Sequence, residues 1–414
     1  MRAASVSANS PRVARLSVSS AAASVPEWLQ QRLKRCSGAV PFSTYMEWAL
    51  HDPEHGAYGS GRLSIGPKGD FATSPSLGPD FAALLAPQLA AWLQQLAEQE
   101  GSEGRLSLVE TGPGEGTLAL QLAQELAAGW PALADRCELV LVEPNPGMAE
   151  RQRRLLAQAP LPVRWCRFTD LAQAPVRGVV LAHEVLDALA VERITSDGEQ
   201  WRRQLVRLEP PSDGPGRLLL EPGDPLSPEL QALLAPLQLA EPGPQRPSGW
   251  SSELHTGMAP WLEEAGAALA QGWLLVIDYA MEAWRYYAPS RSDGTLMAYR
   301  QQRAYGDPLL DPGHCDLTAH LCIEQLEAAA RATGWQPIGQ CRQGEALLAL
   351  GLAQRLHGLQ HGATPDQLPE LLARREALLR LVDPHTLGDF RWLAFARGEA
   401  AAAAERPAFL SPPP

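Results

Sequence analysis

Lysine is nearly absent from this chain of 414 residues. Only Lys34 and Lys68 are lysines among 35 basic residues, and no block of basic residues is longer than two. The net charge is −12. This composition argues against a general nucleic-acid binder, because phosphate binding needs a basic face. A local basic patch is still compatible with the sequence.

Long apolar runs and closely paired cysteines are also missing. The longest apolar stretches, such as WLLVI at 273–277, are far too short to span a bilayer, so no transmembrane helix is expected. The six cysteines lie far apart without a C-x-x-C motif, which favours reduced thiols over a disulfide framework. The expected location is therefore the cytoplasm.

Several catalytic motifs are absent as well. Neither a G-x-S-x-G elbow nor a Walker-A lysine occurs, so a hydrolase or an NTPase would lack its nucleophile or its phosphate clamp. His51 and His55 have i,i+4 spacing, but the proline and glycine around them oppose the helix that would direct both rings at one metal. His314, Cys315 and His320 are explained more simply as polar loop residues. No metal site is expected.

The first 26 residues contain three arginines, many serines and no acid. This is the composition of a disordered tail, which we favour for residues 1–26, or of an organelle transit peptide. An organellar location would follow from the second interpretation. There is no apolar signal-peptide core, so secretion is not expected.

Hydrophobic periodicity divides the rest of the chain. Apolar residues at three- and four-residue spacing predict a cap of helices and loops over 27–100. A core over 101–355 then alternates strands with helices, which predicts an α/β fold with a parallel, doubly wound sheet. The expected strands are 106–110, 138–143, 163–166, 178–184 and 272–280, and the expected helices are 117–129, 147–158, 257–271 and 318–333.

Two insertions interrupt this core, at 191–250 and 281–317. The first opens with a hairpin across Ser-Asp-Gly at 196–198 and continues through a Pro/Gly-rich excursion with one short helix. Further strands are expected near 335–341 and 346–352. Residues 356–414 are expected to form a helical extension with a disordered tip.

A glycine turn, ETGPGEGT at 110–117, lies between the first core strand and its helix. Such a turn lets backbone N–H groups approach an anionic ligand, although a tight turn without any ligand is the alternative. Glu110 ends the strand before the turn, where it would repel a pyrophosphate but attract an ammonium group. Glu143 ends the second strand, where a carboxylate accepts ribose hydroxyls in this sheet type. Together these features describe a site for S-adenosylmethionine.

Three more candidates follow the fourth core strand, in the segment AHEVLDAL. His183, Glu184 and Asp187 would lie at the carboxyl edge of the sheet, where ligands of such folds bind. The two acids could hold a cationic acceptor, above all a guanidinium, and take up its proton during methyl transfer. In the alternative interpretation, Asp187 caps a helix and Glu184 is solvated.

Several stretches taken together resemble the MidA family, the bacterial relatives of the mitochondrial complex I assembly factor that is a protein arginine methyltransferase. These stretches are HDPEHGAY, GDFATSPS, VETGPGEGT, LVEPNP, HEVLDAL, VIDYA and GTLMAYRQQRAYGDPLLDPGHCDLTAH, in the family's order over about residues 28–355. The resemblance implies a class I methyltransferase sheet, with the N-terminal cap and the insertions added to it. It also implies S-adenosylmethionine as donor and an oxidoreductase subunit as protein substrate.

The resemblance assigns residues to sites. It places the donor at Glu110, Gly112, Pro113, Gly114, Thr117, Glu143 and Pro144. It matches Asp70, Phe71, Thr73, Ser74 and Pro75 to a loop that folds over the donor or the acceptor, and we count Thr73, Ser74 and Pro75 as cofactor-binding. It matches Glu184, Asp187 and Ala188 to the acceptor string, so Glu184, Asp187 and His183 are the catalytic candidates.

The sequence also departs from the family pattern. His183 stands in place of Asn, Val185 and Leu186 in place of two Phe, and Ala190 in place of Pro. Glu115 replaces a usual Arg in the glycine turn, and the loop SPSLG lacks the Glu of the family's SPEIS. Most of these changes lie at the expected acceptor site, so they bear on the acceptor and on catalysis more than on donor binding.

The sequence therefore predicts a methyltransferase dependent on S-adenosylmethionine, acting on an arginine of a protein in a complex I-like assembly. The alternatives are a non-catalytic assembly chaperone that binds the donor structurally and a small-molecule methyltransferase. A homodimer is possible through the N-terminal helices or the excursion at 209–250, although no specific signal marks it.

Overall fold

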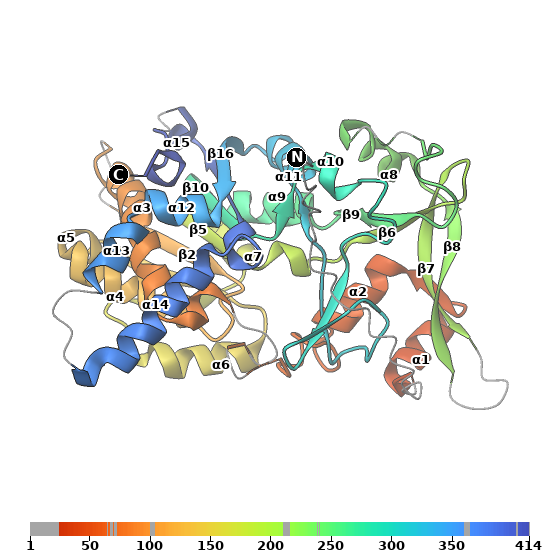
Figure 1. Ribbon diagram of the computed structural model, residues 1–414, viewed down its shortest axis with the longest axis horizontal. Helices are drawn as coiled ribbons and strands as arrows, with labels where there is room; N and C mark the ends of the chain where they lie inside the picture. Colours follow the sequence, from red (N-terminus) through yellow and green to blue (C-terminus); the bar gives the residue numbers. More distant parts are fainter. Residues whose placement is uncertain are drawn as a thin grey trace, which may run out of the picture.

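The computed structural model describes residues 25–63, 65–66, 69, 73–99, 104–209, 216–237, 239, 241–359, 365–402 and 405–413. The expected N-terminal tail lies outside these residues, except for Val25 and Pro26. Figure 1 shows two halves, one built around a large sheet and the other around a second, smaller sheet. The large sheet carries most of the predicted site.

Seven strands form the large sheet, in the order β16-β17-β10-β5-β2-β3-β4. Five of them, from β10 to β4, are mutually parallel, whereas β17 runs antiparallel to both of its neighbours. The α/β class is thus confirmed, but the expectation of a wholly parallel sheet is wrong at β17. The bounds are β2 Leu106–Thr111, β3 Cys137–Val142, β4 Val163–Cys166, β5 Val176–His183, β10 Leu269–Asp278, β16 Gln336–Arg342 and β17 Arg391–Arg397.

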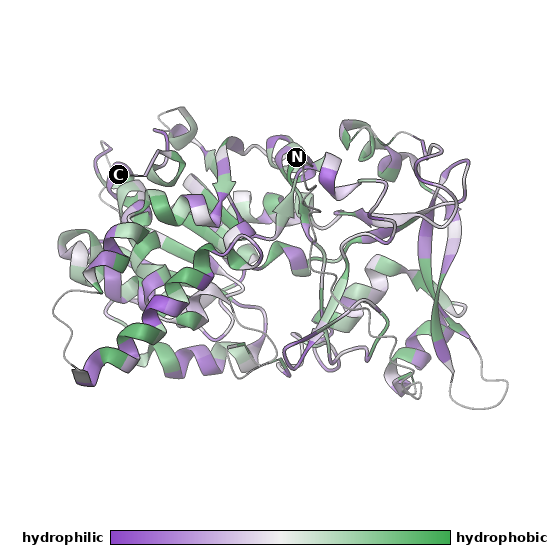
Figure 2. Cartoon of the chain, in the orientation of Figure 1, coloured by the Kyte–Doolittle hydropathy of each residue, from purple (hydrophilic) through white to green (hydrophobic). Residues whose placement is uncertain are grey.

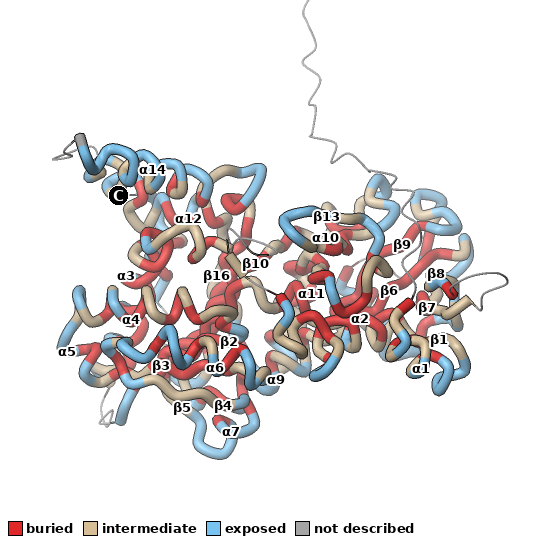
Figure 3. The backbone as a smooth tube through the Cα atoms, turned by 90° about the horizontal axis from the view of Figure 1, so that it is seen from below, coloured by how far each residue is buried: buried red, intermediate tan, exposed pale blue. Residues whose placement is uncertain are grey.

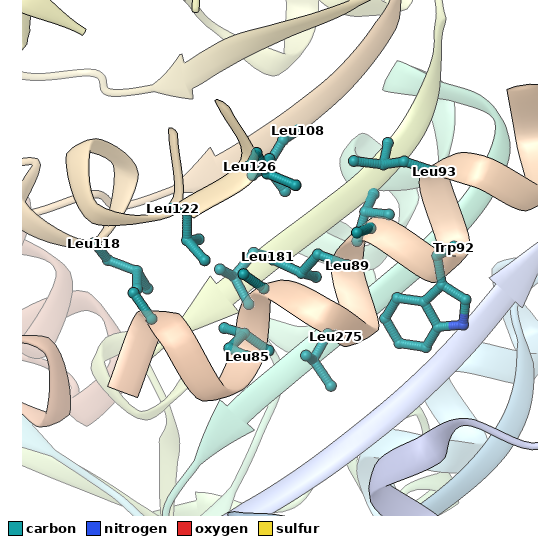
Figure 4. Close-up of a cluster of buried hydrophobic side chains, with 14 of the residues drawn as sticks. Leu85, Leu89, Trp92, Leu93, Leu108, Leu118, Leu122, Leu126, Leu181 and Leu275 are labelled. Atoms are coloured by element: carbon teal, nitrogen blue, oxygen red, sulfur yellow. The ribbon is translucent and has the colours of Figure 1, made fainter. Parts of the chain in front are cut away.

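Helices cover both faces of the large sheet, because successive strand residues point to opposite sides and both sides are apolar. In β2, Leu108 belongs to one buried cluster and Val109 to the other. Leucines of α3 (Asp80–Ala97) and α4 (Thr117–Gly129) pack on the first face, as Figure 4 shows. The second face is covered by α7 (Phe168–Gln173), α9 (Met258–Ala268) and α11 (Ile323–Ala332). Figure 2 shows the same concentration of hydrophobic residues in the strands and in α3 and α4.

The predicted elements before residue 209 agree closely with the structure. The helix expected at 117–129 is α4, and the helix expected at 147–158 is α6 (Pro146–Leu155) followed by a short 3-10 helix, η2 (Leu156–Gln158). The hairpin after residue 191 is present as β6 (Glu192–Ser196) and β7 (Trp201–Glu209). Two short helices were not expected, α7 and α5 (Pro131–Ala134).

The other half of the molecule is organised by β7, which pairs with β1 (Ala39–Pro41), β6 and β8 (Arg217–Pro225). β9 (Ser251–Leu254) completes this sheet. The N-terminal helices α1 (Glu27–Arg35) and α2 (Phe42–His51) share a buried cluster with this sheet, and Figure 3 shows buried residues around α2, β6 and β7. β8 was missed because its Pro222 and Pro225 resemble loop residues, although proline is tolerated in an edge strand such as this one.

The described part of the excursion after β8 holds the short helix α8 (Pro228–Ala232), followed by a 3-10 helix, η4 (Ala235–Leu237). The second insertion contains short elements rather than loop alone. These are β11 (Ala280–Met281), α10 (Ala283–Tyr286), β12 (Met297–Arg300), β13 (Arg303–Tyr305) and β14 (Asp316–Thr318), with β15 (Leu321–Cys322) just after the insertion. Its end returns to the large sheet, where the N–H of Ala319 donates to the carbonyl of Asp187 at 2.9 Å. Asp316 is thereby brought near the end of β5.

The C-terminal region differs most from expectation. The apolar run at 346–352 is not a strand but belongs mainly to α12 (Gln343–Ala349), because leucine and alanine favour a helix and such a run does not settle its own type. Helices α13 (Leu352–Gly358), α14 (Leu368–Val382) and α15 (Glu399–Ala402) are as expected in kind, but 391–397 forms β17. Phe409, in the tip where disorder was expected, is buried between Trp92 and Trp392. No helix in the described ranges is long and apolar enough to cross a membrane.

Candidate functional site

The glycine turn joins β2 to α4 at the carboxyl edge of the sheet. Gly112, Gly114 and Gly116 have φ angles of 55°, 55° and 86°, a region that other residues rarely adopt. The turn is also crowded: a Cβ on Gly112 would lie 3.0 Å from Val185 Cγ2, and one on Gly114 would lie 2.8 Å from Ile65 Cδ1. Glycine is therefore needed here for both conformation and space. Pro113 and Thr117 lie in the same turn, as predicted.

Glu110 is buried directly before this turn. Burial raises the pKa of its carboxyl group to about 8, although a hydrogen bond from the backbone N–H of Ala119 opposes the shift. Its Oε2 atom has no hydrogen-bond partner among the described residues. A cationic group placed next to this oxygen would offset the cost of burying the carboxylate and would supply the hydrogen-bond partner that it lacks.

Glu143 directly follows β3, the strand that pairs with β2, and each oxygen of its carboxylate accepts a hydrogen bond. Its Oε1 atom accepts the N–H of Asn145 at 2.8 Å, and its Oε2 atom accepts Nε2 of Gln152 at 2.9 Å. The same Gln152 nitrogen donates to the carbonyl of Gly114 at 2.8 Å, so Glu143 is tied to the glycine turn. Each carboxylate oxygen keeps a second lone pair that a hydroxyl group could use. Pro144 lies beside it, just before α6.

The turn after β5 carries Glu184 and Asp187 and is anchored by Asp278 at the end of β10. Asp278 Oδ2 accepts the backbone N–H groups of Val185, Leu186 and Asp187 at 3.3, 3.0 and 3.2 Å. Glu184 has a φ angle of 54°, which is strained for a residue other than glycine. Since Val185 also packs on Gly112, this acid-bearing turn lies directly against the glycine turn.

Four carboxyl groups gather at this point: Asp187, Asp278 and Asp316 are buried, and Glu184 is nearly so, with 11% of its side chain exposed. Burial raises the pKa values of Glu184 and Asp187 far above their usual range, and the negative charges of Asp278 and Asp316 raise them further. Burial likewise raises the pKa of Asp278 to about 7. Such a cluster is costly when ionised unless a cation enters it.

Phenol groups surround these acids. The Tyr58 phenol lies next to Asp316, and burial together with the negative charge of Asp316 raises the pKa of this phenol. Tyr299 and Tyr279 are also close enough that the acids help burial to raise the pKa values of their phenols. Three tyrosine side chains thus lie near the carboxyl cluster.

His183 lies beside the cluster, but its role differs from that of the acids. Burial lowers the pKa of its imidazole to about 3, so the ring is neutral at physiological pH. Its Nε2 atom lies 3.5 Å from Glu184 Oε1, and its ring packs on Phe81 with centroids 5.3 Å apart. The neutral ring therefore brings no positive charge to the cluster.

The loop that contains Thr73, Ser74 and Pro75 forms a short 3-10 helix, η1 (Ser74–Leu77). The Ser74 backbone lies next to the Glu184 carboxyl group, where it opposes the rise of the pKa, and the Pro75 carbonyl accepts Nε2 of Gln121 at 3.4 Å. The loop therefore contacts the acid cluster and α4. Its assignment to the cofactor stays a prediction, and Asp70 and Phe71 lie outside the described residues.

Asp278, Asp316, Tyr58 and Gln152 were not identified from the sequence. Asp278 ends a predicted strand at the carboxyl edge of the sheet. Tyr58, Asp278 and Asp316 also lie in HDPEHGAY, VIDYA and DLTAH, which carry the family resemblance, but none of them was singled out. The unexpected Glu115 in the glycine turn forms an ion pair with Arg151, with Oε2 and Nε 3.1 Å apart.

These features define a class of protein. A doubly wound sheet, a crowded glycine turn after its first strand and an acid after its second are features of class I methyltransferases dependent on S-adenosylmethionine. Comparison with known proteins agrees. Residues 84–341 match the family described as "Putative S-adenosyl-L-methionine-dependent methyltransferase". The chain belongs to this family, which confirms the MidA-like resemblance and makes S-adenosylmethionine its cofactor.

Several relatives are similar over most of their length. The Drosophila melanogaster "Protein arginine methyltransferase NDUFAF7 homolog, mitochondrial" is 28% identical over 395 residues, which cover 88% of this chain and 83% of that protein. The Homo sapiens "Protein arginine methyltransferase NDUFAF7, mitochondrial" is 25% identical over 385 residues, which cover 86% of this chain and 79% of that protein.

Two solved structures from Burkholderia thailandensis share the fold. One, bound to S-adenosyl-homocysteine, is 30% identical with a TM-score of 0.79, and the match covers 94% of each chain. The other, a native crystal structure, is 27% identical with a TM-score of 0.76 and the same coverage.

Proposed function

We propose that this methyltransferase modifies an arginine side chain of a protein, a subunit of a complex I-like oxidoreductase. The observation that supports arginine is the cluster of four buried or nearly buried carboxyl groups beside the glycine turn. A guanidinium stays charged when buried and presents five N–H donors in one plane, which suits several carboxylates at once. The names of the relatives support a protein acceptor. The complex I-like client rests on the family resemblance alone.

The residues at the glycine turn fit the donor. The unpartnered Glu110 oxygen would hold its ammonium group, the backbone of Gly112 and Gly114 leaves room for close approach, and Glu143 would accept its ribose hydroxyls. When bound, S-adenosylmethionine supplies a methyl group on a positively charged sulfur, which takes the S–CH3 electron pair as the new N–CH3 bond forms.

The acceptor-side residues would then position the guanidine and remove a proton. Glu184 and Asp187 would bind its N–H groups from one turn, which Asp278 holds in place. As the nitrogen gains the methyl group, its proton passes to one of these carboxylates. A raised pKa makes them better bases than ordinary carboxylates. His183 is too weak a base for this step and would act by packing beside Glu184.

Methyl labelling would test this proposal. The purified chain is titrated with S-adenosylmethionine by calorimetry. It is then incubated with methyl-labelled donor and an extract of the native host lacking the gene. Label recovered as methylarginine in protein is the expected result.

Each other outcome points elsewhere. Failure to bind the donor would refute the proposal that this chain is an active methyltransferase. Binding without any transfer would favour the assembly chaperone, and label in small molecules would favour the small-molecule methyltransferase. A Glu184→Gln variant should bind donor normally and lose transfer, whereas full activity would remove Glu184 from the site. A homodimer stays a prediction that light scattering of the purified chain can check.

A further inference from the structure

The loop 52–61, directly after α2, contacts both sides of the site through Tyr58. On the donor side, the Tyr58 backbone carbonyl accepts Nδ2 of Asn145 at 3.2 Å, and the same amide donates to the carbonyl of Gly59. On the acceptor side, the Tyr58 phenol lies next to Asp316, whose negative charge helps burial to raise the pKa of the phenol. One residue thus connects α6 with the carboxyl cluster.

The loop has a defined internal structure, so its two contacts are mechanically linked. Tyr58 N–H donates to the carbonyl of Leu50 at 2.9 Å, and Ser60 N–H donates to that of Gly56 at 2.9 Å. The Asp52 carboxylate accepts two backbone N–H groups at the start of the loop. A Cβ on Gly59 would lie 2.1 Å from the carbonyl oxygen of Asp52, so the turn is tightly packed. A shift of the loop at Asn145 would therefore shift the Tyr58 side chain as well.

Asn145 in turn is fixed by the donor site. Its backbone N–H donates to Glu143 Oε1 at 2.8 Å, and its Oδ1 atom caps α6 by accepting the N–H of Met148 at 2.9 Å. Hydrogen bonds thus link Glu143 through Asn145 to the backbone of Tyr58, whose phenol lies next to Asp316. One end is Glu143, the proposed ribose partner, and the other is a member of the carboxyl cluster in which Glu184 and Asp187 are proposed to bind the guanidinium.

We propose that Tyr58 is a positioning residue through which occupation of the donor site orders the acceptor site. A donor held by Glu143 fixes Asn145 and with it the loop 52–61, and the Tyr58 hydroxyl then holds Asp316 toward the acceptor. The inference rests on the proposed function for the identity of the acceptor. It implies that the donor binds before the acceptor, because the acceptor site is complete only with the loop in place.

Hydrogen exchange on the full chain tests the donor half of this link without any acceptor. Amides of 56–60 are expected to exchange more slowly when S-adenosyl-homocysteine is bound. Asn145→Asp is nearly isosteric and keeps the oxygen that caps α6, but it can no longer donate to Tyr58 and Gly59. It should abolish the protection of 56–60 and leave that of α6. Unchanged protection of 56–60 in this variant would overturn the proposal.

Tyr58→Phe tests the acceptor half, because it removes only the hydroxyl group. The variant should keep the loop protection and the affinity for S-adenosyl-homocysteine, whereas methylarginine formation in the host extract should fall by about tenfold or more, the effect of losing a hydrogen bond to a charged group. Tyr305→Phe, on β13 of the same half, is the matched control and should behave as wild type.

The outcomes separate the two proposals. If Tyr58→Phe methylates arginine at the wild-type rate, or loses donor affinity as much as rate, the role of Tyr58 is refuted while the proposed function stands. If the wild type makes no methylarginine but its loop is still protected through Asn145, the donor link is supported and the proposed acceptor is refuted.

Discussion

Replacing Glu110 with glutamine should change stability and donor affinity in opposite directions. The wild-type carboxyl group has a pKa of about 8 in the folded chain, against 4.5 for an ordinary glutamate. A raised pKa means that folding favours the protonated form. The stability it contributes is therefore complete below pH 4.5 and is lost as the pH rises toward 8.

The magnitude follows from the size of that shift. At 1.36 kcal/mol for each pKa unit, the wild type should lose about 4 kcal/mol of unfolding free energy between pH 5 and pH 9 at this one site. Glu110→Gln has no charge to lose, so its stability relative to wild type should grow by a similar amount over the same range. Urea unfolding at the two pH values measures the difference, and Glu125→Gln on α4 is the control, with no such trend expected.

Donor affinity should fall in the same variant. A neutral amide cannot pair with the donor ammonium, and losing a charged hydrogen bond costs about 1.5–3 kcal/mol, or roughly tenfold to a hundredfold in affinity. Calorimetry measures this effect. A stability difference that does not depend on pH would refute the buried state of Glu110, and unchanged affinity would refute its contact with the ammonium group.

Three further changes test other parts of the structure. Gly112→Ala should weaken donor binding by about tenfold or more in calorimetry. A φ of 55° costs a residue with a side chain about 1–2 kcal/mol, and the added Cβ would also meet Val185. Gly129→Ala, where the added Cβ has open space around it, is the control and should bind the donor normally. The kcat/KM for methyl transfer should rise with pH through the raised pKa values of Glu184 and Asp187, because the ionised acids hold the cation. Asp187→Asn removes a negative charge beside Glu184 and should therefore move that rise to lower pH. A wild-type kcat/KM that falls as the pH rises would contradict the proposal. Phe409→Ala should lower the unfolding free energy by about 3–5 kcal/mol in urea titrations, and a loss below 1 kcal/mol would mean that the C-terminal tip is not part of the core.

The fold around the proposed donor side was largely predictable because its signals are local. A strand, a glycine turn and a helix follow one another within 106–129, and the hydrophobic period marks each boundary. Glu110 and Glu143 could be placed by counting to the ends of two strands. The sheet then brings those ends together without further information.

The acceptor side was only half predictable. Glu184 and Asp187 also follow a strand, but Asp316 reaches them through an insertion whose path the sequence does not encode in any periodic pattern. Tyr58 arrives from another loop, more than a hundred residues away in the chain. Ser74, which lies next to Glu184, likewise comes from a distant loop. These are tertiary contacts, and composition and spacing carry no record of them.

The strand pattern failed at β17 for a different reason. Residues 346–352 and 391–397 are both short apolar runs, and nothing local distinguishes the one that pairs in the sheet. The choice is made by packing: Trp392 and Phe395 of β17 fill opposite faces of the sheet, whereas Leu347 of α12 covers one face.

The late position of β17 in the chain has a consequence for synthesis on the ribosome. β17 lies between β10 and β16 in the sheet, but it is synthesised more than a hundred residues after β10. A nascent chain therefore carries β10 with an open edge for much of its elongation. Such an edge is a template for pairing with other chains. Chains released before residue 391 are expected to aggregate, and pelleting of a truncated translation product beside the full-length one would show whether they do. Quality control of the newly made protein would then depend on its last strand.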